Sequence, residues 1–464
     1  MSNLFDRNRT SSSRRSFLFT SGATAASLTA ASWSKLASGA SPNERIRVGV
    51  IGTGVRGKYL IGNLPETAQV VAICDCAASR MTETLQPRKT FRNVLANFTQ
   101  NDAADCRQYQ DYRHLLEQSA LDAVIIATPD HHHVPIAIMA LERGLDVYLE
   151  KPLSVFIGEG RLLADKVKQT GRILQVGSQQ RTMEINRIAC EFVRDGGLGR
   201  IHRVELPGYP GPISDPQFPA EPIPSGLDWN LFLGPAPFRP HNRHLWVKDD
   251  FKVGRLLWRG WDLFRDYSGH IMTNWGAHSV DMMQYALGRD DTGPVSVETH
   301  PPDSVDATYE HWSHKTPRPT GPQDRRFWPV TMRYADGVEV VFAGANDPMI
   351  IQGELGSIKI RRNFFKLDKP ELMSDPPDPI VAERWEGDGH VARPHLQNWL
   401  DCIRSRNQPN APVEVGHRTV TVCHLANLAR ELNRPLRWDP QNEQFVGDSE
   451  ANARLLREPR KFGS

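Results

Sequence analysis

Residues 46–57 of the chain are Ile46-Arg47-Val48-Gly49-Val50-Ile51-Gly52-Thr53-Gly54-Val55-Arg56-Gly57, and this stretch decides the fold. Its first half is typical of a buried strand, and a helical stretch to Leu64 follows the glycines. The first glycine permits a tight turn, the second lets the backbone approach a pyrophosphate, and the third lets helix and strand pack closely. Because a helix N-terminus favours an anion, the motif predicts a dinucleotide at this turn.

A carboxylate follows at the spacing that such a site requires. The apolar run at residues 70–74 ends in Asp75, a little over twenty residues after Gly52. A carboxylate there accepts hydrogen bonds from the adenosine ribose and repels a 2′-phosphate, which favours NAD over NADP. The nearby cation of Arg80 would soften that preference, so NADP stays an alternative.

Strand and helix patterns then alternate as far as residue 177. The strand-like runs cover residues 121–127, 146–149 and 173–176, and the helical patterns cover residues 134–143 and 154–170. This alternation predicts an α/β fold with a doubly wound parallel sheet.

Polar residues follow two of these strands. One group is Thr128-Pro129-Asp130-His131-His132-His133, and the other is Glu150-Lys151-Pro152. Ligands of an open α/β sheet bind at the carboxyl ends of its strands. Three successive histidines suggest a metal, but neighbours along a chain point in different directions and do not converge on one ion. We therefore expect a polar wall beside a nicotinamide and no metal site.

These motifs together resemble the Gfo/Idh/MocA family, the glucose-fructose oxidoreductase and inositol dehydrogenase group. The resemblance rests on the glycine turn, Thr128-Pro129 with His133, Glu150-Lys151-Pro152 and Val176-Gly177-Ser178-Gln179-Gln180-Arg181. It implies a Rossmann domain followed by an α/β domain with a large, open, mainly antiparallel sheet that commonly mediates homo-oligomers. It also implies that Lys151 bridges nicotinamide and substrate, and that Pro152 is cis. The expected cofactor-binding residues are Gly52, Thr53, Gly54, Val55, Arg56, Gly57, Asp75, Arg80, Thr128, Pro129, His133, Glu150 and Lys151.

The chain after Gly177 has a different pattern. Its predicted elements are a helix at residues 181–195, a strand at 200–206, a proline-dense loop at 207–224, strands at 330–334, 338–342 and 350–360, and helices at 394–404 and 418–432 that close an antiparallel sheet. We therefore expect a leader (1–40), a Rossmann domain (41–177), a substrate domain (178–434) and a tail packing on the body (435–464).

Five tryptophans fall within a short span of this second domain: Trp229, Trp246, Trp258, Trp261 and Trp275. Stacking on the C–H faces of a sugar would explain their density. Core packing would explain it equally, because tryptophan buries a large area in any fold. The sequence leaves both interpretations open.

A second signature is Asp266-Tyr267-Ser268-Gly269-His270-Ile271-Met272-Thr273-Asn274-Trp275-Gly276-Ala277-His278. A helix starting near Thr273 would place Asn274 and His278 on one face. The pair is similar to the family's Asp-x-x-x-His, whose histidine is the general base on a substrate hydroxyl, oriented by the aspartate. Here position 274 is an amide, and His270 stands where the family often repeats glycine.

These departures weaken the expected base. The catalytic residues that we expect are Lys151, His278 and Asn274. An amide can orient a histidine but does not stabilise the imidazolium by charge. Asp281, one turn onward, could assist, or could be a surface or capping carboxylate. Lys151 could itself take the proton if burial and the nicotinamide charge lower its pKa.

Residues 1–40 have the order of an export signal. A basic start with Arg14-Arg15 precedes an apolar stretch at 17–31 and the small residues Ser38-Gly39-Ala40. The apolar stretch is too short and too rich in Ser and Thr to span a bilayer. The segment resembles a twin-arginine signal, whose translocon exports folded proteins; a disordered basic tail is the alternative. We expect a periplasmic or otherwise exported protein that carries its NAD with it.

Composition sets the remaining limits. The chain has 464 residues, of which 39% are hydrophobic and 24% charged, as in an ordinary globular protein, so we expect no membrane insertion of the mature chain. The net charge is +2, and it is −2 without residues 1–40, so we expect no nucleic-acid partner. The six cysteines form no C-x-x-C pair and are expected to be free and buried, although a periplasm would permit one disulfide.

Three functions follow from these observations. The first is an exported NAD(P)-dependent oxidoreductase with tightly bound cofactor, acting on a secondary hydroxyl of a sugar, sugar derivative or cyclic polyol. The second is an NAD-dependent glycosidase or lyase that passes through a transient keto-sugar. The third is a non-catalytic sugar-binding protein derived from the fold.

Overall fold

The computed structural model describes residues 45–118, 120–213, 218–243, 245–246, 260–301, 310–311, 314–315, 325–344, 348–377 and 392–461. The predicted leader at residues 1–40 and Trp258 therefore lie outside the described residues. Residues 42–464 form one compact unit, which contains both sheets of the fold.

Six described strands form a parallel sheet in the order β3-β2-β1-β4-β5-β6. Their bounds are β1 Ile46–Ile51, β2 Ala68–Cys74, β3 Arg107–Tyr109, β4 Ala123–Ile126, β5 Asp146–Leu149 and β6 Leu174–Val176. Strands β4, β5 and β6 are wholly buried, as parallel strands are when helices cover both faces. The strand order reverses between β1 and β4, so the carboxyl ends of these two strands flank the crevice where such sheets bind ligands.

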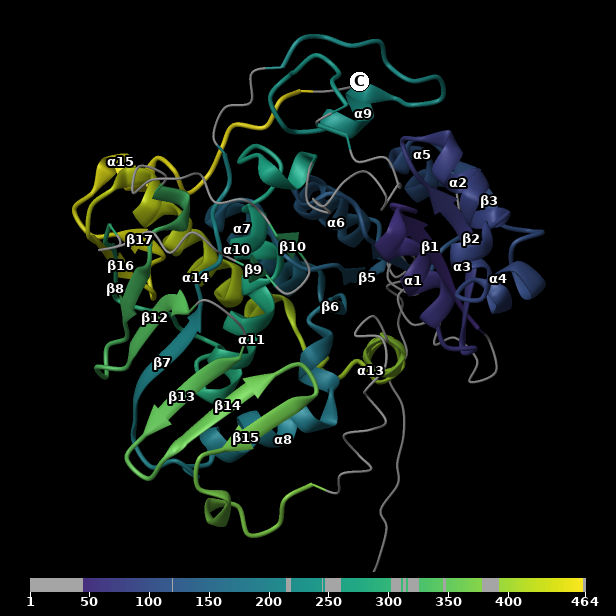
Figure 1. The fold of residues 1–464 in the computed structure, drawn as a ribbon. Helices are drawn as coiled ribbons and strands as arrows, with labels where there is room; N and C mark the ends of the chain where they lie inside the picture. Colours follow the sequence, from purple (N-terminus) through teal and green to yellow (C-terminus); the bar gives the residue numbers. More distant parts are fainter. Residues whose placement is uncertain are drawn as a thin grey trace, which may run out of the picture. The chain divides into compact units, whose positions relative to one another are not determined.

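Helices follow the strands of this sheet (Figure 1). They are α1 Val55–Asn63, α2 Ala78–Leu85, α3 Lys89–Arg92, α4 Ala96–Asn101, α5 Tyr112–Gln118, α6 His133–Glu142 and α7 Ile157–Thr170, with a 3-10 turn η1 at Asp130–His132. The doubly wound sheet predicted from the sequence is confirmed.

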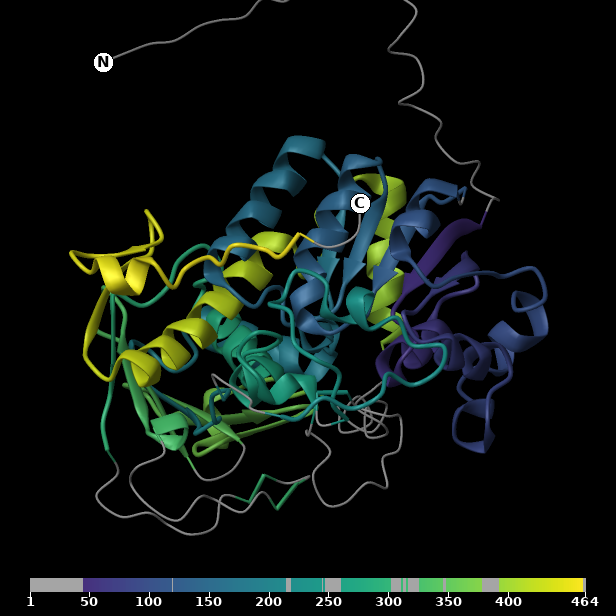
Figure 2. The same ribbon diagram turned by 90° about the horizontal axis from the view of Figure 1, so that it is seen from above.

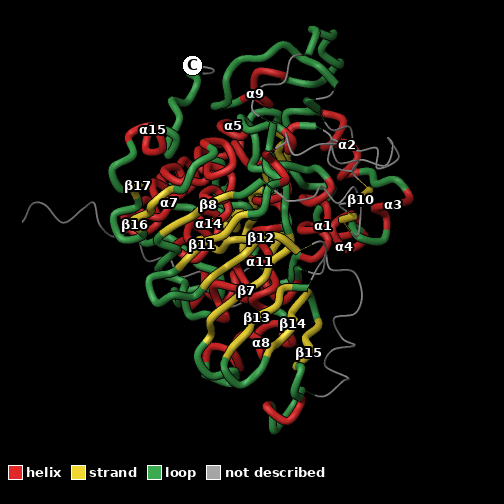
Figure 3. The backbone as a smooth tube through the Cα atoms, turned by 60° about the vertical axis from the view of Figure 1, so that its left-hand side comes forward, coloured by secondary structure: helices red, strands yellow, loops and turns green. Residues whose placement is uncertain are grey.

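A second sheet contains nine described strands in the order β15-β14-β13-β7-β12-β11-β8-β16-β17, which run side by side in Figure 3. Their bounds are β7 Ile201–Pro207, β8 Ser296–Thr299, β11 Val330–Arg333, β12 Glu339–Gly344, β13 Met349–Gly353, β14 Ser357–Arg361, β15 Phe364–Leu367, β16 Leu436–Asp439 and β17 Gln444–Phe445. Strands β7 and β12 pair in parallel and the other neighbours among these described strands are antiparallel. The predicted, mainly antiparallel sheet is confirmed. Strands β9 Glu310–His311 and β10 His314–Lys315 form a separate pair.

Helices cover one face of this second sheet. The described helices of this half are α8 Glu184–Arg194, α9 Trp229–Leu233, α10 His270–Asn274, α11 Gly276–Ala286, α14 Val413–Leu432 and α15 Ser449–Asn452. Apolar side chains of α8, α11 and α14 share one core with the strands. In β14, Ile358 and Ile360 point into this core, whereas Lys359 and Arg361 point to solvent. One face of the strand is therefore open to solvent.

Helix α13, Arg393–Ser405, does not close the second sheet as we expected. Its buried residues Leu396, Trp399 and Leu400 pack in one core with Val48 and Ile125 of the Rossmann sheet. In Figure 2 this yellow-green helix stands among the blue elements of that sheet. The sequence pattern identifies the apolar face of the helix, but it does not say which sheet covers that face.

Two further expectations need correction. The run at residues 350–360 is a hairpin rather than one strand, because β13 ends at Gly353 and β14 begins at Ser357. The polar tail from residue 435 contributes strand β16, which pairs with β8 and so extends the second sheet.

The described tryptophans pack mainly into protein. Trp229 stacks on Phe232 with ring centroids 4.7 Å apart, and Trp246 and Trp261 pack against the same cluster. All six cysteines are free; Cys76 is partly buried and the others are buried. Among the described helices, none is both long and apolar enough to cross a membrane.

Candidate functional site

The glycine turn after β1 leaves a space at the start of α1. Gly52 has φ +92°, and an added Cβ would lie 2.5 Å from the Ala127 carbonyl oxygen. A Cβ on Gly57 would overlap the Gly52 carbonyl. A Cβ on Gly54 would meet nothing closer than Arg80 Nη1, at 3.5 Å. No side chain of the protein caps α1, so its first N–H groups have no side-chain acceptor. Of the three glycines, only Gly54 has open space beside its Cα, and this space at the helix N-terminus fits a pyrophosphate.

The carboxylate of Asp75 lies beside this turn. Asp75 Oδ2 accepts hydrogen bonds from the Thr53 N–H (2.9 Å) and the Thr53 hydroxyl (3.2 Å), and Oδ1 accepts from the Ala77 N–H (3.0 Å). The Arg80 guanidinium stacks on the Trp246 ring, 4.4 Å from its centroid. Asp75 and Arg80 thus flank the end of β2, where the motif places the adenosine ribose.

A segment of the second half covers this end of β2. We call residues 226–246 the covering segment; residue 244 lies outside the described residues. The Ala78 N–H donates to the Gly226 carbonyl (2.9 Å), and the Asp228 N–H donates to the Cys76 carbonyl (2.9 Å). Gln110 Nε2 donates to both carbonyls. With Trp246 on Arg80, the covering segment lies against the predicted ribose-binding edge.

The loops after β4 and β5 are tied together by His133. Its Nδ1 lies 2.7 Å from the Pro152 carbonyl oxygen and its Nε2 lies 3.0 Å from that of Thr128. His131 and His132 each place Nε2 2.9 Å from the Phe232 carbonyl oxygen. The three rings thus contact backbone carbonyls, and the described residues contain no group of three His, Cys, Asp or Glu side chains that could hold a metal.

Arg56 links the glycine turn to the next strand ends. Its Nε donates to Glu150 Oε1 (2.7 Å) and its Nη2 donates to Gln179 Oε1 (2.7 Å). A Cβ on Gly177 would lie 2.8 Å from Glu150 Oε1, so this glycine makes room for the carboxylate. Arg56 and the space at Gly177 thus fix the position of Glu150, which directly precedes Lys151 in the chain.

Lys151 reaches across to the helices of the second sheet. Its Nζ donates to Asn274 Oδ1 (3.0 Å) and to the Asn274 carbonyl oxygen (3.3 Å). Burial lowers the pKa of Lys151; Glu150 and Asp130 oppose this effect, while Arg56 adds to it. The Lys151–Pro152 peptide bond is cis, as the resemblance implied.

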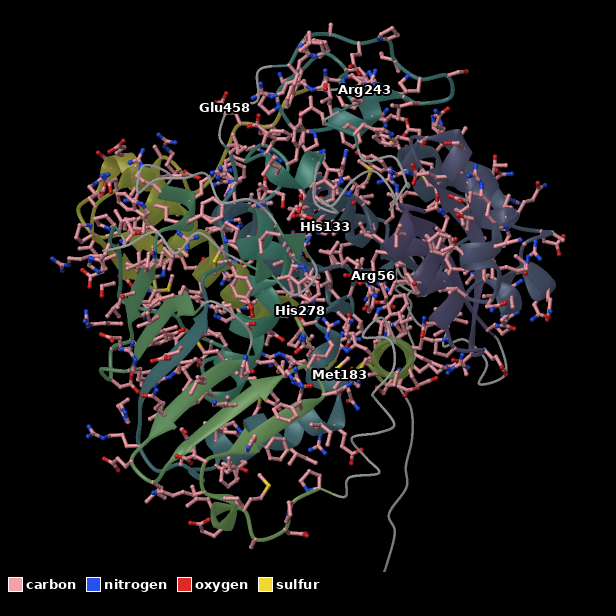
Figure 4. The ribbon with its side chains drawn as sticks, viewed as in Figure 1. Arg56, His133, Met183, Arg243, His278 and Glu458 are labelled. Atoms are coloured by element: carbon pink, nitrogen blue, oxygen red, sulfur yellow. The ribbon has the colours of Figure 1, made fainter. Side chains whose placement is uncertain are left out.

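His278 lies near Lys151 but not against Asn274. The helix expected from Thr273 is two helices, because α10 ends at Asn274 and α11 begins at Gly276. The Asn274 amide faces Lys151, and the His278 ring makes no side-chain hydrogen bond within the described chain. Burial, then the charges of Lys151 and Arg362, hold the pKa of His278 well below its ordinary value. Figure 4 shows Arg56, His133 and His278, which come from α1, α6 and α11, in the middle of the view.

Asp281 is neither a surface carboxylate nor a partner of His278. It is 1% exposed, and both of its oxygens accept from Arg181 Nε, at 2.9 and 3.0 Å. The Thr419 hydroxyl also donates to it (3.1 Å). The candidate role of Asp281 in assisting the base is therefore replaced by a buried ion pair.

The structure adds four residues that the sequence did not single out as functional. The Ser268 hydroxyl donates to Asp130 Oδ2 (2.7 Å), and Asp262 Oδ1 lies 3.7 Å from His270 Nδ1. Burial raises the pKa of Asp130 to about 8; the Ser268 hydroxyl and Lys151 oppose this rise, and Asp262 adds to it. Asp130 and His270 stand inside quoted motifs, which is a usable signal, whereas nothing near Asp262 indicates a site.

Two family models match the chain. One is described as the NAD-binding Rossmann fold of the GFO_IDH_MocA oxidoreductase family and matches residues 46–178. The other is described as the C-terminal alpha/beta domain of that oxidoreductase family and matches residues 213–462, more than half of the chain.

Curated relatives match parts of the chain. It is 36% identical over 91 residues to scyllo-inositol 2-dehydrogenase (NAD(+)) of Bacillus subtilis, which covers 20% of this chain and 27% of that protein. It is 27% identical over 223 residues to a glycosyl hydrolase family 109 protein of Stenotrophomonas maltophilia, which covers 47% of each. The matches thus span about a quarter to a half of these relatives' lengths.

A solved structure shares the fold over most of the chain. The WlbA dehydrogenase from Bordetella pertussis, in complex with NADH and UDP-GlcNAcA, aligns with a TM-score of 0.58 and 17% identity. The alignment covers 86% of this chain and 99% of that chain.

Proposed function

Because the chain belongs to the Gfo/Idh/MocA oxidoreductase family, we propose that it is an NAD-dependent oxidoreductase acting on a secondary hydroxyl of a sugar, sugar derivative or cyclic polyol. One observation carries the proposal. Lys151, which follows β5, lies at the same edge of the parallel sheet as the glycine turn, and it donates a hydrogen bond to Asn274 of the second half. The relatives support the substrate class, since one is an inositol dehydrogenase and another was crystallised with a nucleotide sugar.

The chain's own residues fit NAD. The glycine turn, Asp75 and Arg80 would hold its adenosine and pyrophosphate. Thr128, Pro129 and Glu150 would line the nicotinamide side, with His133 bracing the loops after β4 and β5. When bound, NAD accepts a hydride from the carbon that carries the reacting hydroxyl.

Lys151 would bind the oxygen of that hydroxyl. An ammonium has three N–H donors, and the two contacts to Asn274 leave one donor for substrate. The sequence predicts His278 as the general base. Its pKa is held well below the ordinary value, so the ring is neutral, and a neutral imidazole can accept a proton. The cations Lys151, Arg362 and Arg56 disfavour the imidazolium that would form, so His278 is a weak base in this setting.

We further propose that the enzyme is exported by the twin-arginine translocon to the periplasm with its NAD tightly held. Arg14-Arg15 and the apolar stretch after them support export. The covering segment supports retention, because it lies on the ribose edge that a departing nucleotide would cross. The open face of the second sheet is where we place a homo-oligomer contact.

A second candidate is an NAD-dependent glycosidase or lyase. The family 109 glycosyl hydrolase relative, matched over 47% of each protein, favours it. Transient oxidation of a glycoside acidifies the neighbouring C–H bond, elimination then cleaves the glycosidic bond, and the hydride is returned. The same residues serve both candidates, so their net products distinguish them.

The test starts from natively exported protein washed free of small molecules. After denaturation, mass spectrometry should find near-stoichiometric NAD, and mixed polyols and glycosides should yield either oxidised sugar or cleaved glycoside. Lys151→Met should keep the fold and lose turnover. Protein that is empty and stays empty after NAD is added back would refute both enzymatic candidates and leave a sugar-binding protein.

A further inference from the structure

His270 starts helix α10 in a backbone conformation that disfavours any side chain. Its φ is +56°, in the left-handed region where glycine has no steric penalty. The residue is nevertheless buried, with 8% of its surface exposed. Such conformations persist when the surroundings fix them, and they concentrate at functional sites.

A carboxylate without another partner lies behind the His270 ring. Asp262, in the 3-10 turn η3 at Trp261–Leu263, is 3% exposed. Neither of its oxygens has a hydrogen-bond partner among the described residues, and the same holds for His270 Nδ1, which lies 3.7 Å from Asp262 Oδ1. An unpaired buried carboxylate is costly, so a small approach of these two groups would satisfy both.

The His270 backbone is also connected to Lys151. The His270 N–H donates to Ser268 Oγ (3.1 Å), whose hydroxyl donates to Asp130 Oδ2 (2.7 Å). His270 starts and Asn274 ends the same five-residue helix, α10. Asn274 accepts from Lys151 Nζ, so the short helix that His270 starts is in contact with this lysine.

The charges around the two candidate histidines differ in sign. His278 has cations near it and, with an amide at position 274, no carboxylate partner among the described residues. His270 faces Asp262, and Asp130 lies beyond the Ser268 hydroxyl. A carboxylate stabilises the imidazolium that proton abstraction creates, whereas cations oppose it.

We propose that His270, positioned by Asp262, is the general base that takes the proton of the substrate hydroxyl. This inference rests on the proposed function. The O–H proton moves to His270 Nε2 while Nδ1–H donates to Asp262. The electron pair of the C–H bond leaves as hydride to the nicotinamide, so that the alcohol becomes a carbonyl and atoms and electrons balance. The carboxylate-backed histidine of the family pattern has thus moved in this chain from positions 274 and 278 to positions 262 and 270.

His270→Gly tests this inference without threatening the fold, because glycine relieves the positive φ. We expect unchanged or higher thermal stability and unchanged NAD content. Single-turnover reduction of bound NAD by a polyol should fall by about 10²- to 10⁴-fold, and added imidazole should partly restore it. Asn433→Gly is the matched control, since Asn433 also has positive φ (+52°) but ends α14 at the surface, and it should reduce NAD at the wild-type rate.

Asp262→Asn tests the positioning role. We expect kcat to fall while KM for the polyol is unchanged, and stability to hold or rise because an unpaired buried charge has been removed. A His270→Gly enzyme as active as wild type would overturn this inference and leave the proposed function standing. If wild-type protein binds NAD but no sugar, sugar derivative or cyclic polyol reduces that NAD, both the inference and the proposed function are overturned.

Discussion

Gly54→Ala should weaken NAD binding strongly while the fold stays intact. At Gly54 φ is −64° and ψ is −168°, an extended backbone that alanine adopts readily. The added Cβ meets no protein atom closer than Arg80 Nη1 at 3.5 Å. It would instead occupy the space at the start of α1 where the pyrophosphate binds.

The size of the effect can be worked out for both states. Without NAD, the free energy of unfolding should change by less than about 1 kcal/mol, the usual scale of a changed N-cap. With NAD at 100 times its wild-type Kd, binding stabilises the wild type by about 2.7 kcal/mol. If the methyl group weakens NAD binding about 100-fold, the same concentration stabilises the variant by only about 0.4 kcal/mol.

Urea unfolding of nucleotide-stripped protein, with and without NAD, measures this difference. Gly52→Ala is the matched control, because its Cβ would lie 2.5 Å from the Ala127 carbonyl oxygen at φ +92°, so it should lower stability even without NAD. Equal stabilisation of Gly54→Ala and wild type by NAD would refute the assignment of this turn to the pyrophosphate.

Three further changes test other parts of the site. Asp281→Ala should lower the free energy of unfolding by about 3 kcal/mol, because Asp290, whose side chain is 38% exposed, then remains as the carboxylate partner of the buried Arg181 guanidinium among the described residues; urea unfolding checks this. Asn274→Asp places a carboxylate beside Lys151 Nζ, which raises the pKa of Lys151, so the alkaline limb of the kcat/KM profile should move to higher pH; an unmoved limb would contradict the contact. Trp246→Ala removes the ring under Arg80 and should speed NAD release about fivefold, measured by dilution of loaded protein into excess competing nucleotide.

Much of the Rossmann half follows from the sequence because its signals are local. The buried strand Ile46–Ile51, the glycines and Asp75 lie in one strand-turn-helix-strand unit, so their spacing along the chain fixes their proximity in space. The same holds for Glu150 and Lys151 at the end of β5. The cofactor side of the candidate site was accordingly predictable.

The substrate side was less predictable because its contacts join distant parts of the chain. Asn274 lies one helical turn from His278 in sequence, yet its amide accepts a hydrogen bond from the partly buried Lys151, 123 residues away along the chain. Asp281 likewise forms its ion pair with Arg181, 100 residues away along the chain. The partner of a buried charged group depends on the tertiary structure. Helical periodicity predicts only the face of the helix on which the group lies.

The strand order explains how tight cofactor retention and substrate turnover would coexist. The covering segment is hydrogen-bonded to residues that follow β2 and β3, on one side of the reversal between β1 and β4. It also reaches the other side as far as the residues after β4, because the Phe232 carbonyl oxygen lies 2.9 Å from Nε2 of His131 and of His132. Lys151 follows β5, on the other side of that reversal. The described hydrogen bonds of Lys151 Nζ run to Asn274 and not to the covering segment, so we expect substrate to exchange at Lys151 without release of that segment from the ribose edge. No hydrogen bond between the covering segment and Lys151 is described, so the two substitutions should act independently. The double variant should release NAD as fast as Trp246→Ala and lose turnover as Lys151→Met does.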